Sequence, residues 1–352
     1  MRVDPLTSPT AAGLPCAPEA IDDFISRPTP GAVNVVARAA GPFMVLGAGG
    51  KIGLHLSVML RRALDQLGRK DRVIAVSRFS TLRDKADFEE RGVETMPCDL
   101  NDPASLARLP DAPTIFFLAG VKFGTAGAPG LLHATNVEMP KSVAAKFKRS
   151  RIVAYSSGCV YPFVTPASGG ATEATPLVAL GEYAASCIAR EEAFTQVAAE
   201  RGNPVALIRL NYSVEFRYGL LVDIAQMVLQ GRPVDVTTGY VNVIWQTDAV
   251  AHSIQALEAA RAPAVPINVT GADILSVRDL AHRFGQTLGR PVTITGQEAD
   301  TAWLNNAALS HRLFGPPATS VSQMIEWVSA WLLRGGETWG KPTGFERRDG
   351  RF

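Results

Sequence analysis

The sequence has few of the residues that mark metalloproteins, disulfide-rich secreted proteins or membrane proteins. Its 352 residues include only four cysteines and five histidines, and none of these forms a CxxC pair or another metal-ligand spacing. No apolar run approaches the roughly 20 residues that cross a membrane, and the N-terminus lacks the basic start and apolar core of a signal peptide. We therefore expect a cytoplasmic protein with free thiols and with neither a metal nor a membrane partner.

An excess of charge is also missing. The chain carries 35 Lys and Arg against 33 Asp and Glu, a net charge of +2, and its basic residues do not cluster. Nucleic acid is therefore excluded as a partner, because such proteins carry a concentrated basic surface. Hydrophobic residues make up 47% of the chain, an ordinary share for a globular protein that binds a small molecule.

The most informative segment that is present is a glycine-rich turn between an apolar run and a helical pattern. Residues 43–46 predict a short buried strand and residues 54–67 predict a helix, the strand–turn–helix order that a dinucleotide-binding loop requires. Glycines permit the tight turn and the close approach of backbone N–H groups to a pyrophosphate, and the helix N-terminus faces that anion. The loop residues assigned to a nucleotide site are Gly47, Gly50, Lys51, Ile52 and Gly53.

Strand and helix patterns then alternate along the chain. Further candidate strands lie at residues 73–76, 93–97, 114–118, 152–155 and 205–209. Amphipathic segments separate them, at residues 82–91, 103–109, 131–147 and 182–201. Repeated strand–helix units imply an α/β fold with a doubly wound parallel (Rossmann) sheet, whose ligands bind at the carboxyl ends of the strands.

The pattern divides the chain into four parts. We expect an N-terminal extension at 1–41, a dinucleotide-binding Rossmann domain mainly at 42–210, a smaller C-terminal substrate-binding lobe mainly at 211–334, and a flexible tail at 335–352. The extension contains two short helical patterns, at 18–26 and 28–39, and its role is open between a packing arm and a dimer arm. The glycine-containing, charged tail is expected to fray.

Several short motifs together resemble one enzyme family. The glycines follow the spacing GxxGxxG, Asp99 and Leu100 follow the third candidate strand, and Leu118-Ala-Gly ends the fourth. Asn136 has a Thr-Asn-Val setting, and residues 155–162, YSSGCVYP, resemble the pattern SSxxVYG with proline in the last place. Over about residues 42–330 the chain resembles the extended short-chain dehydrogenase/reductase family, which includes sugar-nucleotide epimerases and dehydratases. Beyond the loop, the resemblance implies NAD or NADP contacts from Asp99, Leu100, Leu118, Ala119, Gly120, Asn136 and Tyr155.

The end of the second candidate strand bears on the choice of cofactor. A carboxylate there accepts hydrogen bonds from a ribose 2′-OH, whereas a nearby arginine suits a 2′-phosphate. This chain has Ser77 at the usual acidic position, and Arg78 follows it. We therefore predict a preference for NADP over NAD.

The resemblance also implies catalytic residues, with one departure. Ser157 and Tyr183 match the serine and tyrosine that hydrogen-bond the substrate oxygen, and the tyrosine exchanges a proton while nicotinamide exchanges a hydride. The family pattern YxxxK requires a lysine four residues after the tyrosine, but this chain has Cys187 there. A thiol supplies neither the positive charge nor the ammonium donors of lysine.

Three explanations for the missing lysine stay open. Another cation substitutes for it, and we favour Lys122, which follows the fourth candidate strand, over Arg190, which shares a helix face with Tyr183. Alternatively, Tyr183 acts only as an acid in carbonyl reduction, or the protein binds nucleotide without redox chemistry. A covalent role for Cys187 is disfavoured, because reactive thiols need an accessible, electropositive setting.

The expected activity follows from this resemblance. It implies an epimerase/dehydratase-like oxidoreductase that acts on a sugar, sugar acid or sugar nucleotide, with Ser157, Asn211 and Arg217 on the substrate side. An NADPH-dependent carbonyl reductase of a non-sugar metabolite and a redox-silent nucleotide-binding protein are the alternatives. The resemblance further implies a homodimer formed through the helices at 131–147 and 182–201, with the alternative that the apolar faces of these helices belong to the core.

Overall fold

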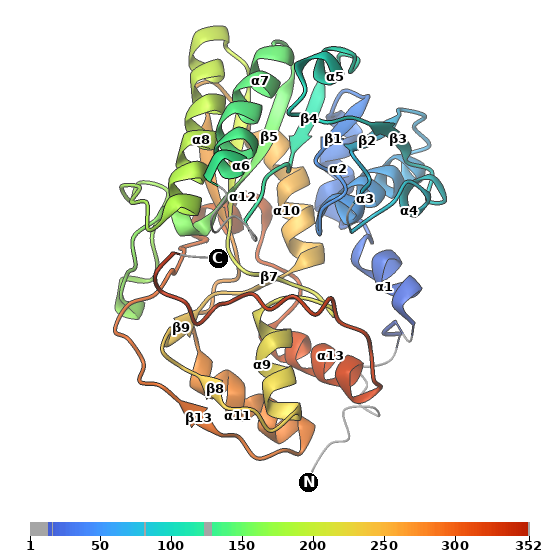
Figure 1. Cartoon of the computed structure of the whole chain (residues 1–352). Coiled ribbons are helices and arrows are strands. Elements are labelled where there is room, and N and C mark those ends of the chain that lie inside the picture. The colour runs from blue at the N-terminus through green and yellow to red at the C-terminus, as the bar shows by residue number, and fades with distance from the viewer. Residues whose placement is uncertain (1–12, 16, 81, 123–128, 351–352) are drawn as a thin grey trace.

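A computed structural model describes residues 13–15, 17–80, 82–122 and 129–350, so Cys16 lies outside the described residues. Its centre is a seven-stranded sheet in the order β11-β6-β5-β4-β1-β2-β3, and every neighbouring pair in it is parallel. The strands are β1 (Phe43–Leu46), β2 (Val73–Ser77), β3 (Glu94–Pro97), β4 (Thr114–Phe117), β5 (Arg151–Ser157), β6 (Val205–Leu210) and β11 (Val265–Val269). The prediction of a doubly wound α/β fold is confirmed (Figure 1).

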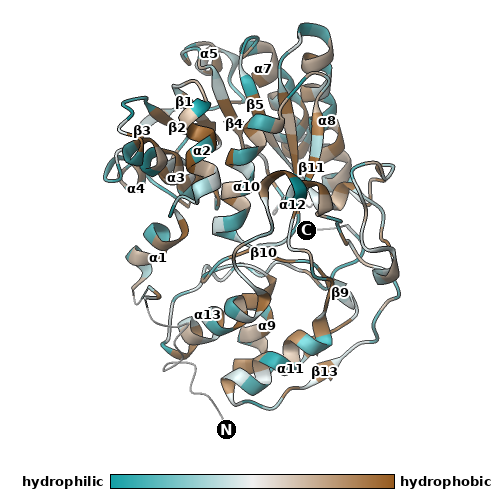
Figure 2. Ribbon diagram, turned by 180° about the vertical axis from the view of Figure 1, so that it is seen from behind, coloured by the Kyte–Doolittle hydropathy of each residue, from teal (hydrophilic) through white to brown (hydrophobic). Residues whose placement is uncertain are grey.

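The central strands are apolar because helices cover both faces of the sheet. All four residues of β1 are buried, and Val45 pairs with Ala75 on one side and Phe116 on the other. In Figure 2 the hydrophobic colour accordingly follows the strands of the sheet. One core cluster packs against α2, α3 and α10, and a second packs against α5, α7 and α8.

The helices follow the predicted alternation. They are α1 (Pro18–Ile25), α2 (Pro30–Arg38), α3 (Gly53–Gln66), α4 (Ala86–Glu89), α5 (Pro103–Ala107), α6 (Pro129–His133), α7 (Met139–Lys146), α8 (Glu182–Arg201), α9 (Leu220–Leu229), α10 (Gln246–Ala259), α11 (Val277–Leu288), α12 (Ala308–Phe314) and α13 (Val321–Leu333). Two predicted helices differ in detail. The segment expected at 82–91 is helical only over α4, and the one expected at 131–147 contains a π-helical turn, η2 (Ala134–Glu138), between α6 and α7. Among the described residues, no helix combines the length and the apolarity that a membrane span requires.

A smaller lobe lies below the sheet in the view of Figure 1. Helices α9, α11 and α13 supply most of its hydrophobic cluster. Short strands complete it: β7 (Ser213–Val214), β8 (Val234–Asp235), β9 (Tyr240–Val241), β10 (Ile244–Trp245), β12 (Leu275–Ser276) and β13 (Ile294–Thr295). Within the range expected to form this lobe, α10 and β11 instead return to the sheet.

The N-terminal extension joins the two parts. Ile21 and Ile25 of α1 are buried in the lobe cluster, whereas α2 packs on α3 and α10 beside the sheet. Asp22 of α1 accepts hydrogen bonds from buried His55 (2.8 Å) and from Arg217 of the lobe (2.6 Å). The described part of the extension, α1 and α2, therefore packs between the two parts of this chain.

The C-terminal segment differs from the expected flexible tail. Phe345 is only 2% exposed, and the Thr343 N–H and hydroxyl donate to Asp223 at 2.8 and 2.6 Å. Near its end, Arg348 donates to the Thr301 hydroxyl at 3.0 Å. Figure 1 shows the segment, in dark red, crossing between the sheet and the lobe. These contacts correct the prediction, which counted glycines and charges without knowing their partners.

Candidate active site

Two cavities lie at the carboxyl edge of the sheet. The first, here the glycine-loop cavity, has a volume of about 340 Å³. It contains nine of the residues predicted to contact a nucleotide: Gly47, Gly50, Ser77, Arg78, Asp99, Leu100, Leu118, Ala119 and Gly120. The second, here the tyrosine cavity, has a volume of about 280 Å³ and is lined by Ser157, Tyr183, Lys122 and Asn211 among others.

The glycine loop is shaped by close packing against the next strand. Gly47 has a φ of +81°, and a Cβ atom there would lie 2.5 Å from both the backbone N and the Cα of Ala119. Gly53 is equally constrained, because its Cβ would lie 2.5 Å from the Cα of Ala48. Only glycine fits these two positions, since real side chains do not approach so closely. The loop therefore brings bare backbone to the edge of the cavity.

The residues present fit a dinucleotide. Helix α3 begins directly after the loop, its N-terminus has no side-chain cap, and its first turn carries no acidic residue. Its N–H groups and dipole are thus available to a pyrophosphate. Around the rest of the glycine-loop cavity, Ser77 and the exposed Arg78 stand at the end of β2. Asp99 is the single acidic residue among the described residues that line it.

The tyrosine cavity brings the predicted catalytic residues together. Tyr183, in the first turn of α8, and Ser157, the last residue of β5, both line it. Lys122, from the loop after β4, also lines it, with Nζ 5.5 Å from the centre of the Tyr183 ring. The Ser157 hydroxyl lies 3.1 Å from the Cys159 sulfur and accepts a hydrogen bond from the Cys159 N–H at 3.3 Å. A serine, a tyrosine and a lysine thus face one small volume.

Burial controls the protonation of this group. It raises the pKa of Tyr183 well above its ordinary value, and the neighbouring thiols of Cys187 and Cys159 add to the rise. Burial also lowers the pKa of Lys122, because the ammonium loses hydration. Tyr183 is therefore protonated at neutral pH and is ready to donate its proton. Cys187 is fully buried and is not among the residues that line the cavity.

Arg190, the other candidate cation, lies outside the lining of the tyrosine cavity. It is 5% exposed and packs against Gly120, and its Nη1 donates to the carbonyl oxygen of Tyr155 at 3.2 Å. Its Nε and Nη2 are buried without a hydrogen-bond partner. Its positive charge opposes the rise in the pKa of Tyr183. Arg190 is thus close enough to act electrostatically, although it does not line the tyrosine cavity.

Gly53 of the loop and three further predicted contact residues line neither cavity. Asn136 is fully buried in the π-helical turn, where its amide bonds to both backbone groups of Val121 at 2.8 Å and so holds the loop that carries Lys122. Tyr155 faces α10, and its hydroxyl donates to Ser253 at 2.7 Å. Arg217 is buried in ion pairs with Glu215 and Asp22. None of these three side chains lines either cavity, so their direct contacts with cofactor or substrate stay predictions.

Sequence reasoning missed part of the tyrosine cavity. Lys51 and Ile52, expected at the nucleotide, line this cavity instead of the glycine-loop cavity. The unpredicted lining residues include Tyr212, Tyr218, Gln246, Trp303 and Thr343. They come from the lobe, from α10 and from the tail, and no local motif marks them. One signal is conformational, because Tyr212 has a φ of +38°, and such strained residues cluster at functional sites.

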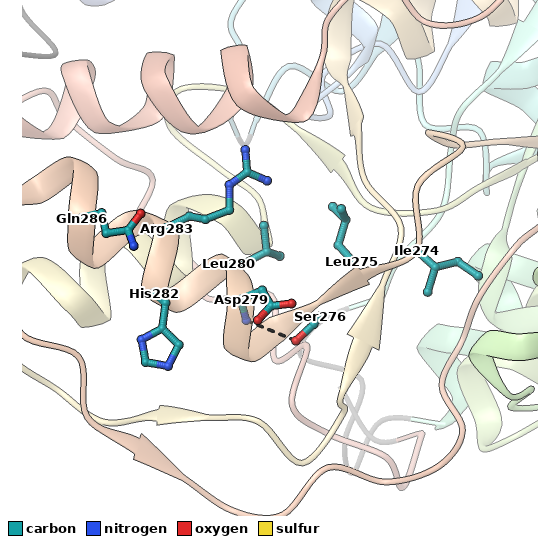
Figure 3. Close-up of a pocket in the computed structure, with 8 residues that line it drawn as sticks. All are labelled: Ile274, Leu275, Ser276, Asp279, Leu280, His282, Arg283 and Gln286. Carbon is teal, nitrogen blue, oxygen red and sulfur yellow. Dashed lines mark hydrogen bonds between the residues drawn. The ribbon is translucent and has the colours of Figure 1, made fainter. Parts of the chain in front are cut away.

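A third hollow lies away from these residues. It is a surface groove between β12 and α11, and Figure 3 shows His282 directed away from Arg283 there. Ser276 accepts the Asp279 N–H at 3.2 Å as a helix cap, and Arg283 donates to Ser322 at 3.0 Å. Because these polar groups serve the packing of the lobe, the groove has no cluster of reactive groups. The two cavities at the sheet edge are the candidate site.

Comparisons with known proteins identify the family and support the fold. The sequence model of the NAD dependent epimerase/dehydratase family matches residues 43–239, more than half of the chain. No curated protein sequence matches the chain.

Three solved structures have the same fold at low sequence identity. A dTDP-glucose 4,6-dehydratase from Streptomyces venezuelae with NAD bound is 19% identical, with a TM-score of 0.72 over 83% of this chain and 97% of that one. A Thermus thermophilus UDP-glucose 4-epimerase in complex with NAD is 17% identical, with a TM-score of 0.67 over 82% and 97%. A UDP-glucuronic acid 4-epimerase from Bacillus cereus in complex with NAD is 16% identical, with a TM-score of 0.67 over 83% and 99%.

Proposed function

Because the chain belongs to the NAD dependent epimerase/dehydratase family and is an NAD(P)-dependent enzyme of the extended short-chain dehydrogenase type, we propose that it acts at a carbinol or ketone carbon of a sugar, sugar acid or sugar nucleotide. One observation carries the proposal: Ser157, Tyr183 and Lys122 line one cavity beside the glycine-loop cavity. Bound NAD or NADP would supply hydride chemistry there.

The chain's own residues would handle the oxygen and its proton. Ser157 donates a hydrogen bond to the substrate oxygen, and Tyr183 gives its proton to that oxygen or takes it back. Lys122 supplies the positive charge that stabilises the tyrosinate, because an opposite charge nearby favours the ionised phenol. Asn211, whose Nδ2 donates to the Trp303 carbonyl at 3.2 Å, is held at the substrate side of the cavity.

We further propose that NADP is preferred to NAD, and Arg78→Ala tests this. Without the guanidinium, affinity for NADP should fall by about tenfold or more, since a charged hydrogen bond contributes roughly 1.5–3 kcal/mol. Affinity for NAD, which lacks the 2′-phosphate, should stay within about twofold of the wild-type value. Isothermal titration of both nucleotides measures the ratio, and an unchanged NADP/NAD ratio would show that Arg78 plays no part in selection.

A carbonyl reductase is the second candidate. It is favoured by the protonated state of Tyr183, which suits donation to a carbonyl oxygen, and by Arg78 beside the glycine-loop cavity. Mass spectrometry of the nucleotide released on denaturation separates the candidates. Stoichiometric NAD(H) or NADP(H) supports an epimerase or dehydratase that regenerates its cofactor in place. An empty protein that binds NADPH reversibly supports a reductase with an exchangeable cosubstrate.

We also propose that the protein works in the cytoplasm, in carbohydrate metabolism, as a homodimer. Cys98, Cys159 and Cys187 are free thiols, which is typical of reducing compartments. Leu131, which begins the first segment expected at the dimer interface and also lines the glycine-loop cavity, is 51% exposed. Sedimentation velocity measures the oligomeric state, and a monomer at micromolar concentration would reject the dimer.

A further inference from the structure

The tyrosine cavity has a one-sided charge. Lys51 and Lys122 both line it, and none of its described lining residues is Asp or Glu. Lys341 of the tail is near enough to lower the pKa of Lys51 further by repulsion, after the larger effect of burial. Like charges that face a confined space repel each other, and an anion in that space relieves the repulsion.

The ammonium of Lys51 is held in the cavity by a stack of side chains. Its Nζ lies 3.1 Å from the centre of the Tyr218 ring, a cation–π contact. Tyr218 stacks on Trp339 of the tail, with ring centres 5.6 Å apart and an interplanar angle of 29°. Trp339 is fixed in turn by its backbone N–H, which donates to the backbone carbonyl of Arg217 at 3.0 Å. The glycine loop, the lobe and the tail therefore jointly fix the direction of Lys51.

The carboxylates nearest to Lys51 are engaged elsewhere. Asp223 accepts the N–H and hydroxyl of Thr343, and Glu215 is paired with Arg217 at 3.1 Å. Both attract the Lys51 ammonium through space, but neither lines the cavity. Neither carboxylate therefore adds a negative charge to the described lining of the cavity.

The cavity is also small. Its volume of about 280 Å³ is at the lower limit of the roughly 300–1,000 Å³ that holds drug-sized ligands. Part of that volume lies against Ser157 and Tyr183, where the reacting carbon and the nicotinamide must both come. Trp303, Tyr212 and Thr343 occupy the remaining wall. The described lining therefore encloses a compact space, which fits a small substrate better than one attached to a nucleoside diphosphate.

We propose that the substrate is a small polyhydroxy compound with one terminal anionic group, a carboxylate or a phosphate, and that Lys51 binds this group. The inference rests on the proposed function and narrows its substrate class, because it excludes a nucleotide-linked sugar. Lys51 is then a specificity-determining residue contributed by the loop that also holds the cofactor.

The protonation of Lys51 provides a second readout. Its pKa is lowered to about 7, by burial first and then by Lys341 and Lys122, against the attraction of Asp223 and Glu215. The facing Tyr218 is neutral, since burial raises the pKa of its phenol. The ammonium exists below this pKa and is lost as the pH rises through it. Affinity for an anion of constant charge should therefore fall between pH 6 and 9.

The test is calorimetric binding to the full chain saturated with NADP⁺. The probes are glucose, gluconate, glucuronate, glucose 6-phosphate and UDP-glucose, so that the carboxylate and phosphate sources are tested separately. At least one small anion should bind about tenfold to a hundredfold tighter than glucose, the range expected for one charged hydrogen bond. K51M should abolish that preference and K51R should keep most of it. K148M, which removes an exposed lysine outside both cavities, should change nothing.

Each other outcome overturns the inference. The inference is overturned if glucose binds as tightly as the anions or if UDP-glucose binds best. It is also overturned if K51M keeps the selectivity of the wild-type protein, or if no small anion binds. The proposed function would survive the first three results. Conversely, Lys51-dependent binding with neither NADPH oxidation nor conversion of any bound compound to an epimer or a dehydrated product would leave the anion site intact and count against the proposed function. Loss of NADP⁺ affinity in K51M would assign the lysine to the cofactor.

Discussion

Tyr183→Phe is expected to lower kcat by about 10²–10⁴-fold, the contribution of a positioned general acid–base group. Only the phenolic oxygen is removed, so the ring can keep its packing against the buried cluster that contains Val160 and Ala171. Cofactor affinity should change little, because Tyr183 is not among the residues lining the glycine-loop cavity. Steady-state kinetics and NADPH titration measure both quantities.

The matched control is Tyr155→Phe. This change also removes a buried hydroxyl, but one that donates to Ser253 at 2.7 Å and faces α10. It should cost about 1 kcal/mol of stability and leave kcat within about twofold of the wild-type value. Full activity in the Tyr183 variant would contradict its acid role. A large loss of activity in the Tyr155 variant would show that Tyr155 takes part in the cofactor site.

Lys122→Met is expected to lower kcat by about 10²–10³-fold, the usual cost of removing one electrostatic contact to a developing negative charge. The ammonium lies 5.5 Å from the centre of the Tyr183 ring and lines the same cavity. Its loss leaves the tyrosinate without that charge, while NADP affinity should stay close to the wild-type value. Measurement of kcat against pH checks the cause, because the pKa assigned to Tyr183 should rise.

Arg190→Met is the comparison that separates the two cations. Arg190 packs behind Gly120 and also opposes the rise in the pKa of Tyr183. If Lys122 is the working substitute for the missing lysine, its variant should lose more kcat than the Arg190 variant at equal cofactor saturation. An active Lys122 variant beside an inactive Arg190 variant would reverse the assignment.

The predictions that agree with the geometry, the glycine loop and the pair of Ser157 and Tyr183, came from local sequence motifs. The glycine spacing predicts the loop, although only Gly53, which packs on Ala48, is fixed within one strand–turn–helix unit. Gly47 is fixed by its positive φ and by Ala119, which follows the neighbouring strand β4. Ser157 and Tyr183 lie close together because β5 ends, and α8 begins, at the same edge of the sheet. Such placement is decided by topology, which the alternating pattern predicts.

The remaining errors concern side-chain direction and distant partners. Arg217 is expected on the substrate side, but Asp22, 195 residues away in the sequence, holds it in a buried ion pair. The tail looked mobile because its anchor, Asp223, lies on α9. Lys51 turns toward Tyr218 and Trp339, which no local pattern connects to the glycine loop. These contacts depend on how the lobe closes on the sheet, and that information is not local in sequence.

The central claim, a dinucleotide site at the glycine loop, is tested most directly by titrating nucleotide-free protein with NADPH. We predict one site per chain in the micromolar range or tighter, and loss of binding in Gly47→Ala, because the new Cβ would meet the Ala119 backbone at 2.5 Å. Gly68→Ala is the control, since Gly68 also has a positive φ, +66°, but has no atom within 4 Å of a Cβ. Absence of NADPH and NADH binding to the wild-type protein, or equal binding by both variants, would contradict the account.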